Sequence, residues 1–230
     1  MIFLDNPASA DLDYTWHFYN ADGSRAEMCG NGSRCAALLA YELGLAGKNQ
    51  TFGTDAGSIS AQIKDKGQVR VQLTPARDLQ LHMMLTFQEH VPVSVHFVNT
   101  GVPHSVTVCA DLQKVNVSDT GRMIRMHPDF APAGTNVNFI QVKDRSSILL
   151  RTYERGVERE TFACGTGAAA SAIIATALDL CSSPVEVTTT GKERLNIDIQ
   201  ENHVYLTGKA DFIYQGKVYL DTFGLELPRP

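Results

Sequence analysis

The sequence predicts an α+β fold with two similar halves, and three observations lead to that prediction. The motif Cys-Gly-x-Gly occurs at residues 29–32 and again at 164–167. Each copy is followed by an Ala-rich stretch with a helical pattern, which extends to Leu45 or to Leu180. A strand-like run precedes each motif, and alternating apolar and polar residues follow each helical stretch. A pattern that recurs in this order indicates a duplicated unit of strands, one helix and further strands.

The first half starts with a strand-like run at residues 14–19, followed by a turn composition at 20–24. The motif and its helix come next, and residues 51–73 then alternate in the manner of hairpins. The Gly/Pro-containing stretch between Leu73 and Pro92 is the predicted join between the halves. We therefore expect an N-terminal domain at 1–85, to which residues 210–230 can return, and a C-terminal domain at 86–230.

The second half has more residues before its cysteine motif than the first half. Residues 91–108 form an additional block, and residues 136–142 and 147–153 are strand-like runs before the second motif. Residues 185–206 alternate as hairpins do, whereas the polar stretch 119–134 predicts an exposed loop. Counted from Val91, 73 residues precede Cys164, but only 28 precede Cys29. If the halves are duplicates, the first domain lacks its first strands, about forty residues; the alternative is a natural asymmetry.

Composition excludes several classes of protein. With 230 residues, 43% of them hydrophobic and 20% charged, the chain is typical of a globular protein with a substantial core. A net charge of −5 gives no basic footprint for nucleic acid, and no apolar stretch is long enough to span a bilayer. The start has no signal-peptide pattern, and five cysteines without secreted-domain spacing favour a reducing cytoplasm. The composition leaves open whether the protein forms a homodimer.

The paired cysteines suggest proton-transfer chemistry at a carbon. A glycine after each cysteine lets the backbone approach a ligand closely, and free N–H groups at a helix N-terminus bind anions such as a carboxylate. The same field lowers a thiol pKa from roughly 8.5 toward neutrality. Inversion of an amino acid needs a base on one face of the α-carbon and an acid on the other. A thiolate and a thiol supply both, without a cofactor.

Simpler interpretations apply to single residues. A lone cysteine is most often a small buried hydrophobe, which is our prediction for Cys35, Cys109 and Cys181. Five residues between Cys29 and Cys35, with no histidine partner, argue against a metal site. His104, in a loop fixed by Gly101 and Pro103, is either a structural residue or a functional one. The other candidates, which have solvated or turn alternatives, are Asn20, Asn136, Glu154 and Arg155.

Several segments together resemble the diaminopimelate epimerase family over most of the chain. They are Asn-Ala-Asp-Gly-Ser at 20–24 leading to Met-Cys-Gly-Asn-Gly at 28–32, Pro-His at 103–104, Asn-Val-Asn-Phe at 136–139, Glu-Arg-Gly at 154–156 and Ala-Cys-Gly-Thr-Gly at 163–167. The resemblance implies two pseudo-symmetric domains, each a barrel-like strand set around a central helix, with the active site in the cleft between them. It also implies cofactor-free interconversion of LL- and meso-diaminopimelate, for lysine and peptidoglycan synthesis.

The resemblance also implies a role for each candidate. Cys29 and Cys164 are the expected acid/base thiols, and His104 with Glu154 is the expected polar pair that supports them. The expected contacts to the distal end of the substrate are Asn20, Asn136 and Arg155. The expected cradle for the reacting carboxylate consists of Gly30, Asn31, Gly165 and Thr166.

The chain departs from the family pattern in three places. A first strand with a Gly-Asn-Asp-Phe segment is absent, which agrees with the difference between the halves. Val102 stands where many members have an asparagine, and residues 157–159 are one residue longer than in many members. The alternatives are a broader racemase, for example of glutamate, and an inactive binding protein. A thiol oxidoreductase is disfavoured because the chain has no Cys-x-x-Cys pair.

Overall fold

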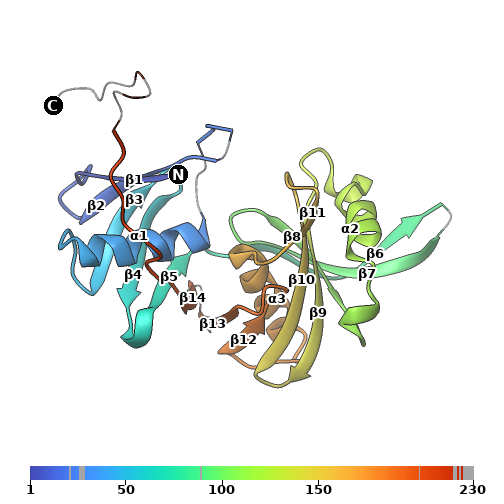
Figure 1. The fold of residues 1–230 in the computed structure, drawn as a ribbon. Coiled ribbons are helices and arrows are strands. Elements are labelled where there is room, and N and C mark those ends of the chain that lie inside the picture. The colour runs from blue at the N-terminus through green and yellow to red at the C-terminus, as the bar shows by residue number, and fades with distance from the viewer. Residues whose placement is uncertain are drawn as a thin grey trace.

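The computed structural model describes residues 1–20, 22–25, 29–88, 90–201, 203–219, 222 and 224. Its strands join one continuous mixed sheet that bends around two helices, so the molecule has two lobes, each with a helix against the inner side of its strands (Figure 1). The predicted α+β class is confirmed. No helix in the described part of the chain is long and apolar enough to cross a bilayer.

The first lobe surrounds helix α1 (Gly30–Glu42), which packs against β4 and β5. Tyr14, Trp16 and Phe52 are buried beside it, and the rings of Tyr14 and Phe52 stack with centroids 5.0 Å apart. These aromatic side chains come from strands whose buried residues alternate, which is why the period-2 pattern identified them. The strands of this lobe are β1 (Ile2–Asp5), β2 (Tyr14–Phe18), β3 (Asn49–Thr54), β4 (Gly57–Ile63) and β5 (Gln68–Leu73).

The second lobe surrounds α3 (Gly165–Ala177), whose run of buried alanines lets the strands approach closely. A second helix, α2 (Val117–Arg125), packs on β9 and β10 over a separate apolar cluster that includes Ile124 and Phe139. The strands here are β6 (Arg77–Phe87), β7 (His90–Asn99), β8 (Pro103–Val108), β9 (Asn136–Asp144), β10 (Ser147–Glu154), β11 (Arg159–Thr161), β12 (Val185–Thr188), β13 (Arg194–Gln200) and β14 (His203–Lys209).

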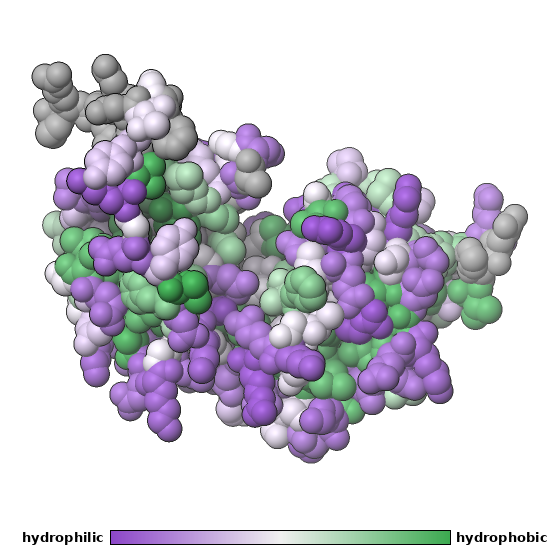
Figure 2. Space-filling model, in the orientation of Figure 1, coloured by the Kyte–Doolittle hydropathy of each residue, from purple (hydrophilic) through white to green (hydrophobic). Residues whose placement is uncertain are grey.

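Strand β14 joins the two lobes. It pairs antiparallel with β13 on one side and with β5 on the other, so the sheet runs without a break from one lobe to the other. The space-filling view shows a notch between the lobes (Figure 2). After β14, the described residues 211–219 form no strand, although Ala210 N–H donates to the carbonyl of Gly67 in the first lobe at 3.0 Å.

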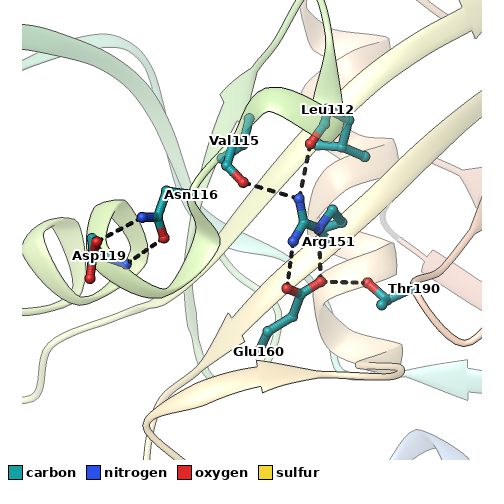
Figure 3. Close-up of polar contacts among 7 residues, drawn as sticks. All are labelled: Leu112, Val115, Asn116, Asp119, Arg151, Glu160 and Thr190. Atoms are coloured by element: carbon teal, nitrogen blue, oxygen red, sulfur yellow. Dashed lines mark hydrogen bonds and ion pairs between the residues drawn. The ribbon is translucent and has the colours of Figure 1, made fainter.

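The structure corrects one local prediction. The predicted loop at 119–134 overlaps α2, whose N-cap is Asn116; the side-chain oxygen of Asn116 accepts from the Asp119 N–H at 3.2 Å (Figure 3). Val117, Gly121 and Ile124 form the buried face of this helix. The predicted join contains β6, which pairs with β7. The domain boundary at 85/86 stays a prediction.

Candidate active site

Cys29 caps the N-terminus of α1. Its backbone is extended, its sulfur accepts from the Gly32 N–H at 3.3 Å, and its carbonyl accepts from the Ser33 N–H at 2.8 Å. The backbone N–H groups of Gly30 and Asn31 have no acceptor in the described part of the chain, as expected in the first turn of a helix. The first thiol therefore lies beside two free donors.

Cys164 repeats this geometry at α3. Its sulfur accepts from the Gly167 N–H at 3.4 Å, and its carbonyl accepts from the Ala168 N–H at 2.9 Å. The N–H groups of Gly165 and Thr166 likewise find no acceptor among the residues described. The sequence repeat is thus also a structural repeat, and the prediction of two thiols at two helix N-termini is confirmed.

The two helix N-termini meet at their glycines. A Cβ placed on Gly165 would lie 3.7 Å from the Gly30 Cα and 3.2 Å from the Leu206 side chain. A larger residue there would push into the space between the helices. The N–H groups of Gly30, Asn31, Gly165 and Thr166, which have no acceptor among the described residues, are thereby gathered at the positive ends of two helix dipoles. Such an arrangement suits a carboxylate.

A cavity of about 680 Å³ opens at this meeting point and has walls from both lobes. It brings together nine of the predicted residues: Cys29, Gly30, Asn31, Asn136, Glu154, Arg155, Cys164, Gly165 and Thr166. Sequence reasoning did not select several other wall residues: Ala56, Leu73, Thr74, Arg77, Thr100 and Ala163. Of these, only Arg77 could have been identified from the sequence, because it is a cationic residue shortly after a predicted strand. Val102, noted as a departure, also lines the cavity.

Two predicted residues are not in the wall. Asn20 is exposed, and its side chain donates to the Ser24 hydroxyl at 3.1 Å across the turn. Ala21 and residues 26–28, which belong to the same motif, lie outside the described residues. His104 is fully buried behind Pro103, which does line the cavity.

The electrostatics of Cys164 differ from expectation. Burial, and then the nearby Glu154 carboxylate, raise the pKa of the Cys164 thiol to about 11. Hydrogen bonds from Thr166 and from the Gly167 N–H oppose this rise, and the charge of Cys29 adds to it. The predicted lowering toward neutrality is therefore wrong for Cys164, because desolvation outweighs the helix N-terminus.

His104 belongs to a buried polar network below α3. Burial, with the positive charge of Arg155 adding to it, lowers the pKa of His104 to about 3. Its Nδ1 lies 3.0 Å from Nδ2 of Asn138, a strand β9 residue that is also fully buried. His104 is consequently a neutral imidazole at physiological pH.

Asn136 connects two loops around the cavity. Its side-chain oxygen accepts from the Arg155 N–H at 2.9 Å, and its amide nitrogen donates to the Pro103 carbonyl at 3.1 Å. Both ends of this amide are therefore engaged with backbone. The geometry gives Asn136 a role in holding the Glu154–Arg155 turn, in addition to its place in the wall.

A half-buried ion pair holds the segment that leads to Cys164 (Figure 3). Arg151 on β10 holds Glu160 on β11 through two contacts of 2.7 and 2.8 Å, and the Thr190 hydroxyl donates to the same carboxylate at 3.0 Å. Arg151 also donates to the carbonyls of Leu112 and Val115 at 3.0 and 3.1 Å. Glu160 on β11 thus bonds to both Arg151 and Thr190, four residues before the second thiol.

Comparisons with known proteins find similar sequences and a similar fold. The family model described as diaminopimelate epimerase matches residues 1–79 and 96–213. The diaminopimelate epimerase of Aquifex aeolicus is 47% identical over 222 residues, which are 95% of this chain and 79% of the relative. That of Hydrogenobaculum sp. is 45% identical, over 97% of this chain and 81% of the relative. A crystal structure of a probable proline racemase from Agrobacterium radiobacter shares the fold, with a TM-score of 0.73 at 17% identity, covering 96% of this chain and 76% of the other.

Proposed function

The chain belongs to the diaminopimelate epimerase family, and from this premise we propose that Cys29 and Cys164 invert one α-carbon of diaminopimelate between its LL and meso forms. One observation carries the proposal: the two N-cap thiols lie at helix N-termini that meet at Gly30 and Gly165. The protein is an isomerase of amino-acid biosynthesis.

The carboxylate of the reacting carbon is the first group that this site recognises. It binds to the free N–H groups of Gly30, Asn31, Gly165 and Thr166. Removal of the α-proton moves charge onto this carboxylate and forms a dianion. Donors already aimed at the carboxylate stabilise that charge without reorganisation, which is the largest electrostatic contribution available here.

Inversion transfers two protons. The thiolate of one cysteine takes the α-proton and becomes a thiol, while the thiol on the opposite face gives its proton to the carbanion and becomes a thiolate. Charge and protons balance, and the next turnover in the reverse direction uses the thiols in exchanged roles. We infer that Glu154 and Arg155, which line the same cavity, meet the polar groups of the substrate.

Removal of either thiol tests this proposal. In Cys29→Ala and in Cys164→Ala the rate of inversion should fall by at least 10²–10⁴-fold, roughly the contribution of one general acid or base. Cys35→Ala is the matched control, because Cys35 is exposed, where the sequence predicted it buried, and does not line the cavity. Inversion would be followed by circular dichroism of the diaminopimelate isomers. Full activity in either alanine variant contradicts the two-thiol assignment.

A broader racemase is the second candidate, and Val102 is the observation that favours it. This apolar side chain lines the cavity, where an amide would give the distal end of the substrate a hydrogen bond. A panel of single amino acids, glutamate and proline included, incubated in D₂O would measure exchange of the α-proton. Exchange with diaminopimelate alone argues against relaxed specificity, and Val102→Asn should narrow any wider range.

Three further features remain predictions from the sequence: a homodimer, a cytoplasmic location and activity without a cofactor. Light scattering after size-exclusion chromatography measures the mass in solution, and activity after dialysis against a chelator tests independence from metals. The inactive binding protein named as an alternative from the sequence would bind diaminopimelate in calorimetry without exchanging its α-proton.

A further inference from the structure

The amide of Asn138 has one orientation in this structure. Its Nδ2 lies 3.0 Å from the backbone carbonyl oxygen of Ser105, an atom that only accepts hydrogen bonds. Its Oδ1 lies 3.0 Å from the Thr152 hydroxyl, which donates. A flipped amide would place two oxygens against each other at Ser105. The Ser105 carbonyl therefore settles which end of the side chain is the donor.

The second N–H of this amide is directed at His104. Nδ2 of Asn138 and Nδ1 of His104 are 3.0 Å apart, so Nδ1 must accept and carries no proton. His104 is neutral because it is fully buried. A neutral imidazole with a bare Nδ1 carries its proton on Nε2.

The Nε2–H of His104 is a buried donor with no hydrogen-bond partner in the described part of the chain. A Cβ on Gly167 would be 2.5 Å from Asn138 Oδ1 and 3.2 Å from Cys164 Sγ, so the Asn138 amide lies directly under the first turn of α3. The buried Nε2–H leaves His104 able to donate a hydrogen bond at that atom and unable to accept one.

We propose that Asn138 is a positioning residue that locks His104 in the Nε2–H tautomer, so that His104 offers a hydrogen-bond donor at Nε2 and not a base. The inference rests on the proposed function for its catalytic meaning, but the tautomer itself does not. Asn138 touches no substrate, and its effect passes through His104.

The wild-type protein provides the first test. In ¹⁵N spectra of histidine-labelled protein, the His104 signal, assigned by its loss in His104→Gln, should show a bare Nδ1 and a protonated Nε2. This pattern should not change between about pH 5 and pH 9, because burial keeps the ring neutral. A protonated Nδ1, or an imidazolium that titrates in this range, overturns the proposal whether or not the protein is an active epimerase.

A variant pair provides the second test. Asn138→Ala removes the hydrogen bond to Nδ1 of His104, so the His104 signal should show a mixture of tautomers. The value of kcat should fall about tenfold, the loss expected from one hydrogen bond, and KM should change little. Thr152→Val is the matched control: it perturbs the same network but leaves the Ser105–Asn138–His104 bonds, and should keep the single tautomer. Loss of the tautomer in both variants, or its retention in Asn138→Ala, overturns the proposal. A fixed tautomer in a wild-type protein without exchange activity would refute the proposed function alone.

Discussion

Removal of Glu193 should destabilise the protein, because this residue neutralises a buried cation between the lobes. Arg34 lies on α1, five residues after Cys29, and its side chain is only 4% exposed. Its Nη2 contacts Glu193 Oε1 at 2.6 Å, and its Nε donates to the Lys209 carbonyl at 3.2 Å. Glu193 lies in the turn between β12 and β13, where the Gly191 N–H donates to the Phe162 carbonyl at 2.8 Å. The pair thus connects the helix of the first thiol with the segment before the second.

The magnitude follows from the burial of the two partners. Loss of one member of a buried pair costs about 3–5 kcal/mol when the other charge is left without compensation. Burial already lowers the pKa of Arg34, and Glu193 is the principal charge that opposes this. Glu193 is 29% exposed, so water can reach the vacated site in Glu193→Ala. We therefore expect a loss below that range, of about 2–3 kcal/mol in the free energy of unfolding.

Urea unfolding at pH 7, followed by the fluorescence of the single buried Trp16, measures this loss. Glu186→Ala is the matched control, since its contact with Arg194 is 3.9 Å long and exposed, and it should cost at most about 0.5 kcal/mol. The double variant Arg34→Met/Glu193→Ala removes both charges and should regain much of the stability. A single variant as stable as the control, or a double variant less stable than Glu193→Ala, refutes the reasoning.

Two further predictions concern the second thiol. The pKa of Cys164 is about 11 in the folded protein and roughly 8.5 for a thiol in an unfolded chain. The stability that the protonated Cys164 thiol contributes is therefore fully present below about pH 8.5. It is lost as the pH rises toward 11, by up to about 1.4 kcal/mol per pH unit. The free energy of unfolding of the wild type should accordingly fall more steeply in this window than that of Cys164→Ala, and parallel curves would contradict the assigned pKa. Gly167→Ala places a methyl group 2.5 Å from Asn138 Oδ1 and should cost about 1–3 kcal/mol in thermal unfolding. Gly47→Ala has only one neighbour, at 3.8 Å, and should change stability by less than about 0.5 kcal/mol; equal effects would show that the space around Gly167 is not tight.

The elements that the sequence predicted are those with local periodicity. Both motif helices and the hairpins after them follow from spacing within single segments, and the structure places their thiols as N-caps. Strand β6 was not predicted, because Asp78 and His82 have positive φ and the pairing of β6 with β7 shifts register. Both features interrupt the alternation of apolar and polar residues. Helix α2 was not predicted, because its buried face consists of a glycine and only two apolar residues, which give no clear helical pattern.

The features of the site that sequence reasoning missed depend on tertiary contacts. The hydrogen bonds of the Asn136 amide to the backbone of Pro103 and Arg155 were not predicted, because those residues are distant from Asn136 in the chain. The pKa of Cys164 depends on how deeply the second lobe buries it, a quantity that no short motif encodes. In the sequence, Asn138 stands out only as part of a motif, because its importance depends on the orientation of its amide toward Ser105.

The fate of the α-hydrogen during the first turnovers in D₂O tests the two-thiol mechanism most directly. A thiol carries a single proton, so the base returns the original hydrogen to the face from which it came, while the opposite thiol delivers deuterium from solvent. Mass spectrometry of separated isomers should therefore find deuterium at the α-carbon of the inverted product and hydrogen in the unreacted substrate. Equal deuterium in both isomers, or original hydrogen in the product, would contradict two opposed thiols.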